Sequence, residues 1–403
     1  MRAANSLRCR QWLVSLLLCY VGITSAAASP SPAVLPKPSG PFGVSASAME
    51  LIDHGRADPF APSHEPRKLM ISAFYPSVRA SQCQTELQPY LPPTTAAFEN
   101  QEFAAYGIPN NTFARLELSL CKPCSDKSAP DLSTTPLVLF SPGLGNSRLV
   151  YSFLAQAIAS AGYIVVTIDH PYDADIVEYP DGSFVGATNI TTEAQIELAL
   201  DTRVKDASFV LTSLSECSTI SHLFPSRPKS IDTSHAGIFG HSLGGAAAYS
   251  AILKDRRFVA SANLDGAFYG NSALKQDKTK HPFLLFGHDG DNQTTVPSWK
   301  TVWSRLEGWK LELELGGSQH EAFEDLPVLA EALGLTSSPA DSPLGQLLLA
   351  TVGTINGTRA SHIISDVMVK FFDFGLNGRS AGPLEEAVKS YHELQVVDKG
   401  NGA

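Results

Sequence analysis

A serine lies between glycines in the segment Gly240-His241-Ser242-Leu243-Gly244. A serine hydroxyl is a poor nucleophile at neutral pH, so it needs a base beside it and hydrogen-bond donors for the carbonyl oxygen of the group that it attacks. Glycines at both ends of such a pentapeptide permit a strained turn between a strand and a helix, which raises the serine above a sheet. We therefore predict Ser242 as the nucleophile of an esterase.

The base is expected among the histidines that follow the serine. His320 comes shortly after an expected strand at 309–315 and a glycine-rich turn that lets the loop fold back over the sheet. His281 and His288 flank another expected strand and are rivals for the role. The side chain of His241 should point away from the nucleophile, in a packing or supporting role. We predict His320 as the base.

A carboxylate at a strand end is needed to orient the imidazole and to stabilise its charged form. Asp265 directly follows the expected strand 258–264, and Asp289 and Asp291 follow the next strand, at 282–286. Loops rich in aspartate and glycine are common, so each of these acids could instead be a solvated loop residue. The residues alone do not decide whether the acid lies at the end of the strand 258–264 or at the end of the strand 282–286.

The oxyanion formed during attack needs two backbone N–H donors, one of them from the residue after the nucleophile. That residue is Leu243. The second donor is expected from the glycine-rich loop Ser141-Pro142-Gly143-Leu144-Gly145, where the flanking glycines let the Leu144 N–H turn inward. The alternative is a loop that only makes a turn.

Apolar runs alternate with helical patterns along the chain. A long amphipathic helix is expected over 193–215, with Thr192 and Gln195 at capping-box spacing. This order indicates an α/β fold with a mostly parallel sheet covered on both faces, in which ligands bind at the carboxyl ends of the strands. A shorter helix is expected over 148–160, and strands are expected at 68–76 (ended by Pro76), 136–140, 163–168, 236–239, 258–264, 282–286 and 309–315.

The N-terminus has the pattern of a secretory signal. Residues 1–28 combine three arginines, a short apolar run and a final stretch of alanines, which predicts a signal peptide and a secreted protein; a retained signal anchor is the alternative. Residues 29–48 are rich in proline, serine and alanine and are expected to form a linker. The segment 49–403 is expected to form one catalytic domain.

Removal of the signal peptide would leave four cysteines in the mature chain. An even number of cysteines in an exported chain predicts disulfides but does not choose the pairing. They are Cys83, Cys121, Cys124 and Cys217. Four N-glycosylation sequons fit the same route, at Asn110, Asn189, Asn292 and Asn356.

Composition excludes several other classes. The formal charge is −10 and no basic run is present, so we expect no nucleic-acid partner. His288, Asp289 and Asp291 could offer metal ligands, but neither HExxH nor a paired CxxC occurs, and no GxGxxG or GxxxxGK indicates a nucleotide. We therefore expect no metal and no cofactor. The expected partner is a small-molecule or lipid ester, with transient contact to a lipid surface.

The segments FSPGLGNSR, GHSLGG, NLDG and GGSQHEAFED together resemble the plasma-type platelet-activating factor acetylhydrolase family of α/β-hydrolases, from about Lys68 to the end of the chain. The resemblance implies an α/β-hydrolase fold, with Ser242, Asp265 and His320 as the triad. It places the oxyanion donors at Leu144 and Leu243. It also implies calcium-independent hydrolysis of a short sn-2 acyl ester of a glycerophospholipid.

One departure widens the range of expected substrates. The family usually has His-Gly where this chain has Pro142-Gly143. The Pro-Gly form also occurs in cutinase-like and polyester-cleaving relatives, whose acid lies one strand later, so Asp289 stays the alternative acid. Cutinase-like or polyester hydrolysis and acyl transfer to a metabolite remain alternatives, whereas the full set of catalytic residues argues against a non-catalytic binding module.

Overall fold

The computed structural model describes residues 31–123, 129–225, 230–270 and 278–401. The signal peptide expected at 1–28 and Cys124 therefore lie outside the described residues. From Pro32 onward the chain forms one compact unit. Within the described residues no helix is both long and apolar enough to cross a bilayer.

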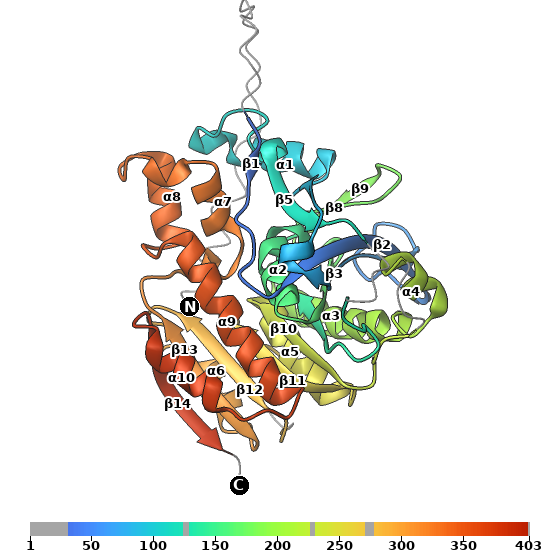
Figure 1. Ribbon diagram of the computed structural model, residues 1–403, viewed down its shortest axis with the longest axis vertical. Helices are drawn as coiled ribbons and strands as arrows, with labels where there is room; N and C mark the ends of the chain where they lie inside the picture. The colour runs from blue at the N-terminus through green and yellow to red at the C-terminus, as the bar shows by residue number, and fades with distance from the viewer. Residues whose placement is uncertain (1–30, 124–128, 226–229, 271–277, 402–403) are drawn as a thin grey trace, which may run out of the picture. The chain divides into compact units, whose positions relative to one another are not determined.

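The centre of the fold is a nine-stranded sheet, counted over the described residues (Figure 1). Its strands are, in spatial order, β14 (Leu394–Asn401), β13 (Trp309–Leu315), β12 (Phe283–His288), β11 (Phe258–Leu264), β10 (Ala236–His241), β6 (Leu137–Ser141), β7 (Ile164–Ile168), β3 (Pro66–Arg79) and β2 (Phe42–Ala57). The six strands from β13 to β7 are parallel, while β14, β3 and β2 are antiparallel to their neighbours. The carboxyl ends of the parallel strands thus meet at one edge, as the sequence predicted.

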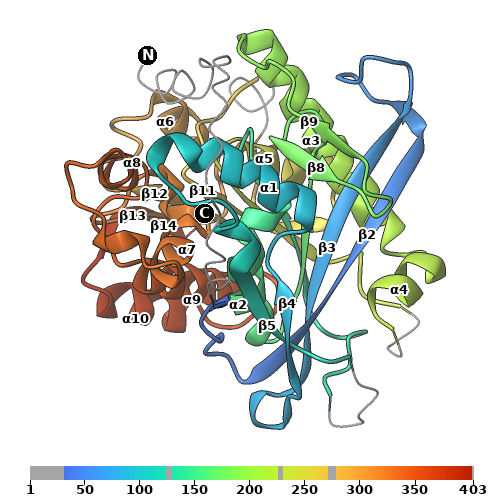
Figure 2. The ribbon, with the colours of Figure 1, turned by 90° about the horizontal axis from the view of Figure 1, so that it is seen from above.

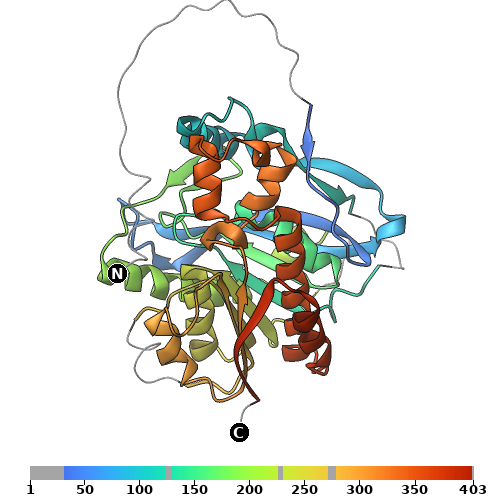
Figure 3. The same ribbon diagram turned by 90° about the vertical axis from the view of Figure 1, so that its left-hand side faces the viewer.

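Helices cover both faces of this sheet. The central strands are accordingly buried on both sides and consist of continuous apolar runs. In Figure 3 the red helices α9 and α10 lie on one side of the strands and the yellow-green α5 lies on the other. The first face carries α2 (Ser152–Ser160), α9 (Gly357–Gly375) and α10 (Gly382–Ser390), and the second carries α3 (Glu193–Ser213), α4 (Cys217–Leu223), α5 (Leu243–Lys254) and α6 (Pro297–Trp303). The capping box expected at Thr192 and Gln195 begins α3.

Two expectations about the N-terminal part are wrong. Residues 42–48 do not belong to a linker but begin the long strand β2, which pairs with β3 over most of its length (Figure 2). Pro76 does not end its strand either, because it lies next to a β-bulge, where the missing N–H is tolerated.

Residues 77–123, whose structure the sequence did not reveal, supply a helix and two strands of a small three-stranded sheet beside the main sheet, and residues 33–34 supply its third strand. The elements are β1 (Ala33–Val34), β4 (Thr85–Pro89), β5 (Leu116–Cys121) and α1 (Pro93–Phe103). A separate hairpin pairs β8 (Ile176–Glu178) with β9 (Phe184–Gly186). The apolar helices α7 (Leu326–Ala332) and α8 (Pro343–Thr351) pack beside the end of α1, with Leu349 52% exposed.

A disulfide joins Cys83 to Cys121 and so links the segment before β4 to the end of β5. Cys217 is a free, exposed thiol. The bridged cysteines are 38 residues apart, a loop for which chain entropy gives a stabilisation of about 4 kcal/mol. We expect the Cys83→Ala/Cys121→Ala variant to unfold at lower denaturant concentration with ester hydrolysis retained, as urea titration and an activity assay would show. An unchanged midpoint would contradict this, and Cys217→Ala is the matched control.

Candidate active site

Ser242 occupies the sharp turn between β10 and α5. Its backbone φ of 54° and ψ of −123° are strained for a residue with a side chain, as expected for a nucleophile elbow. A Cβ on Gly244 would lie 1.9 Å from the Ser141 carbonyl oxygen, so only glycine lets α5 approach the end of β6 this closely. The turn leaves Ser242 partly exposed while its neighbours are buried.

Asp265 lies one strand further along the sheet, directly after β11. It also has a positive φ, of 59°, and its backbone N–H donates to the Phe286 carbonyl at 2.8 Å. A Cβ on Gly266 would lie 2.0 Å from the Ser242 carbonyl oxygen, so the turn after the acid packs directly against the elbow. Asp265 and Ser242 are thereby fixed at neighbouring strand ends.

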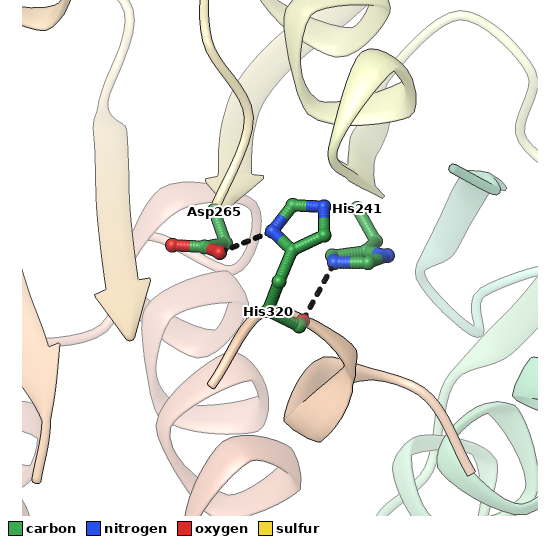
Figure 4. A group of neighbouring side chains, drawn as sticks. All are labelled: His241, Asp265 and His320. Carbon is green, nitrogen blue, oxygen red and sulfur yellow. Dashed lines mark hydrogen bonds and ion pairs between the residues drawn. The ribbon is translucent and has the colours of Figure 1, made fainter. Parts of the chain in front are cut away.

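His320 begins a 3-10 helix, His320–Phe323, that follows β13. Its Nδ1 lies 2.5 Å from Oδ2 of the buried Asp265 (Figure 4). Burial alone would raise the pKa of Asp265, but hydrogen bonds from His288 and His320 hold it well below its usual range. The carboxylate is therefore ionised and able to orient an imidazole.

The other predicted candidates lie elsewhere or make other bonds. Asp289 is exposed, and its Oδ2 accepts the Gly317 N–H at 2.8 Å rather than bonding a histidine. His281 precedes β12, at the end of the strand opposite to the site, whereas His288 ends that strand. The geometry thus favours Asp265 over Asp289 and removes His281 from the site.

His241, next to Ser242, is buried beside the segment that follows β13 and contains His320, here called the histidine loop (residues 316–325) (Figure 4). Burial lowers its pKa to about 3, so the ring is neutral. Its Nε2–H donates to the His320 carbonyl at 3.0 Å, which leaves Nδ1 to accept from the Tyr151 hydroxyl at 2.8 Å. The Tyr151 oxygen in turn accepts the Gly143 N–H at 3.2 Å. A chain of hydrogen bonds therefore connects the loop after β6 to the backbone of His320.

The same loop contains the expected oxyanion donor. The N–H of Gly143 is bonded to Tyr151, and that of Gly145 donates to the Asp173 carbonyl at 3.0 Å. Across the described part of the chain, the Leu144 N–H has no hydrogen-bond acceptor. Leu243 is the first residue of α5, where backbone N–H groups have no intrahelical partner. Both predicted donors are therefore available to an oxyanion.

A buried arginine holds the loop after β6 through its backbone carbonyls. Arg203, on α3, donates to the carbonyls of Pro142 and Gly143, to the latter at 3.0 Å, and forms an ion pair with Asp173 at 2.5 Å. Because the guanidinium binds the carbonyls on one side, the peptide groups of the loop are held in one orientation. Sequence reasoning missed Arg203, although an arginine on the buried face of an expected helix was a usable signal.

The segment after His320 is bonded to the beginning of α2. Asp325 accepts the N–H groups of Phe153 and Leu154, at 2.7 and 3.1 Å, and the Tyr90 hydroxyl at 2.7 Å. These bonds satisfy N–H groups of the first turn of the helix. Burial raises the pKa of Asp325 to about 7. The segment after His320 is thus anchored to α2, and the loop after β6 is bonded to Tyr151, the residue that precedes this helix.

Among the residues that the structure describes, two groups of three bring potential metal-binding atoms within 4.8 Å of one another. They are His241, Asp265 and His320, and Asp265, His288 and Asp291. Both groups share Asp265, whose Oδ2 accepts hydrogen bonds from two imidazoles. Hydrogen bonds to Asp265 account for the proximity of His288 and His320, and His241 is bonded to the His320 carbonyl.

The chain is similar to known proteins over most of its length. The family model described as "Platelet-activating factor acetylhydrolase, isoform II" matches residues 28–210 and 221–373. A "Probable 1-alkyl-2-acetylglycerophosphocholine esterase" of Arthroderma benhamiae is 33% identical over 401 residues, 95% of this chain and 99% of the relative. A platelet-activating factor acetylhydrolase of Canis lupus familiaris is 29% identical over 217 residues, 47% of this chain and 48% of the relative.

A solved structure extends the similarity to three dimensions. The ferulic acid esterase from Streptomyces cinnamoneus superimposes with a TM-score of 0.72 at 27% identity, covering 91% of this chain and 99% of the esterase. The expected α/β-hydrolase fold is confirmed.

Proposed function

The chain belongs to the platelet-activating factor acetylhydrolase isoform II family and is a carboxylic-ester hydrolase, and we propose that it acts through Ser242, His320 and Asp265. The observation that carries this assignment is the meeting of three features at one sheet edge. They are the strained Ser242, the hydrogen-bonded pair of Asp265 and His320, and the Leu144 N–H, which no described residue accepts.

The reaction then has two halves. His320 takes the proton from the Ser242 hydroxyl as its oxygen attacks the ester carbonyl, and the Leu144 and Leu243 N–H groups stabilise the oxyanion. His320 returns the proton to the leaving alcohol, and an acyl-enzyme remains. His320 then takes a proton from water as the water oxygen attacks the acyl carbon, and it returns that proton to the Ser242 oxygen as the bond to the acyl group breaks and the carboxylic acid leaves. Asp265 orients His320 and stabilises its charged form in both halves.

We propose a short acyl ester of a glycerophospholipid as the substrate. The printed name of the Arthroderma benhamiae relative, which matches nearly the whole chain, supports this choice. The ferulic acid esterase neighbour favours a second candidate, a non-lipid carboxylic ester. Hydrolysis rates for glycerophospholipids of increasing sn-2 acyl length, beside a feruloyl ester and a polyester film, separate the two. Preference for the feruloyl ester or the film would reject the phospholipid assignment, and ester products formed with added alcohols would indicate acyl transfer.

We also propose secretion, from the signal-like segment at 1–28 and the sequons. Asn110, Asn189 and Asn356 are exposed, as a glycan acceptor must be. Asn292 is partly buried, and its side-chain amide donates to Glu314. Glycosidase treatment of the protein from culture medium, followed by mass spectrometry, identifies the modified sites; an intracellular, unglycosylated product would contradict the proposal.

The catalytic rate should depend on the protonation of His320. Burial would lower the pKa of this imidazole, but the hydrogen bond and charge of Asp265 raise it to about 9. Only the neutral form accepts a proton from Ser242, so kcat/KM should rise about tenfold per pH unit below this pKa and level off above it. Initial rates with a nitrophenyl ester, corrected for spontaneous hydrolysis, give the profile. A plateau already reached at pH 6 would contradict this interpretation.

A further inference from the structure

A second histidine is hydrogen-bonded to the carboxylate that His320 uses. Nδ1 of His288 lies 2.7 Å from Oδ2 of Asp265, and the His288 backbone N–H donates to Oδ1 at 2.9 Å. The His288 side chain is 16% exposed and the Asp265 carboxylate is fully buried. His288 therefore contacts both oxygens of the acid and restricts rotation of the carboxylate.

The sheet explains this position. Leu264 of β11 pairs with Phe286 of β12 in parallel register, and the Asp265 N–H donates to the Phe286 carbonyl at 2.8 Å. The last residue of β12 therefore lies beside the acid that follows β11. A side chain at position 288 can reach Asp265 without any movement of the backbone.

The oxygen that binds His288 is the one that binds His320. Oδ2 of Asp265 lies 2.7 Å from Nδ1 of His288 and 2.5 Å from Nδ1 of His320, and the two ring centroids are 6.4 Å apart. Each donor withdraws negative charge from the oxygen that it shares. A positive charge on one imidazole also disfavours a positive charge on the other.

From the proposed function, we infer that His288 is a positioning residue for the reaction. It holds the Asp265 carboxylate in the orientation that His320 needs, and by sharing Oδ2 it limits how strongly the carboxylate retains a proton on His320. Without His288, His320 would be less well oriented and more basic. The two consequences can be separated by experiment.

The charged groups around His288 are consistent with this role. Asp265 faces it from the end of β11, Asp291 from its own loop at 3.7 Å, and His320 from the loop after β13. Further out, Glu314 of β13 interacts with Asp291, and Glu321 interacts with His320. Burial would lower the pKa of His288, but Asp265 and then Asp291 raise it, which favours a positively charged ring.

Three variants test the inference through pH profiles of nitrophenyl ester hydrolysis. In His288→Ala, the rate on the alkaline plateau should fall on the order of 10-fold, because the acid is less well fixed. Its ascending limb should also move to higher pH by about half a unit to one unit, since His320 loses a competing donor and a like charge. In His288→Asn, an uncharged amide near the position of Nδ1 should restore most of the plateau and leave the limb shifted.

The control is His281→Asn, a histidine at the other end of the same strand, for which plateau and limb should both match the wild type. A His288→Ala profile equal to that of the wild type would overturn the inference. So would a loss as complete as in His320→Ala, because His288 would then be the base itself. If His288→Ala does not fold, the limb position of His288→Asn decides. Absence of hydrolysis by the wild type, or retention of hydrolysis by Ser242→Ala, would instead reject the proposed function.

Discussion

Ser242→Ala should lose ester hydrolysis by a factor on the order of 10⁶, since no other group in the site can form the acyl-enzyme. The same change should abolish covalent labelling by a fluorophosphonate probe, which reacts with an activated serine. The alanine side chain fits the turn at least as well as serine, so circular dichroism and thermal unfolding should match the wild type. Parallel rate, labelling and melting measurements on one preparation check all three outcomes.

The Ser242→Ala measurements need a control variant that removes another serine hydroxyl. Ser250 of α5 follows the elbow in the same helix, so Ser250→Ala is a matched serine deletion that should keep labelling and activity. Labelling that survives in Ser242→Ala and disappears in another serine variant would reject the nucleophile assignment. Loss of labelling together with loss of the folded state would be recognised from the melting curve.

Asp265→Asn should lower turnover by about 10⁴-fold. The amide has nearly the shape of the carboxylate but lacks its charge, so His320 would lose both its preferred tautomer and the stabilisation of its positive form. Substrate binding does not involve Asp265, and KM should change far less than kcat. Steady-state kinetics over a range of substrate concentrations separates the two quantities.

The alternative acid provides the matched comparison. In Asp289→Asn, the remaining side-chain oxygen can still accept the Gly317 N–H, so activity should stay close to that of the wild type. A large loss in Asp289→Asn with little loss in Asp265→Asn would move the acid one strand along the sheet. Such a result would also place the enzyme nearer to the polyester-cleaving pattern.

The strands that position the site could be predicted because they are buried on both faces, which gives continuous apolar runs. The expected strand at 309–315 coincides with β13, for example. β2 was missed because its first half is made of small and polar residues, typical of a linker. β14 was missed for a similar reason, since its sequence, LQVVDKGN, is mostly polar. Edge strands bury only part of their surface, so their sequences carry a weaker signal.

The candidate site likewise contains residues that local motifs predict and residues whose contacts only the fold reveals. Ser242 and His320 lie in local motifs, and glycines beside Ser242 and Asp265 mark the tight turns that position them. Arg203 and Tyr151 act on the oxyanion loop through contacts that only the folded chain creates. His288 could be proposed as a rival base, but its bond to Asp265 depends on the register of two strands. Local motifs therefore predict the candidate reacting groups, and only the structure reveals the residues that hold them.

The hydrogen-bonded chain from Gly143 through Tyr151 and His241 to the His320 carbonyl has a consequence for recombination among relatives. A homologous segment that lacks its member of this chain would, if exchanged alone, leave a buried hydroxyl, imidazole or amide unpaired, at a cost of about 1–3 kcal/mol for each group. The segments after β6, β10 and β13 should therefore be inherited, and transplanted, together. Chimeras with crossovers outside these three segments should tolerate exchange far better than chimeras that mix them.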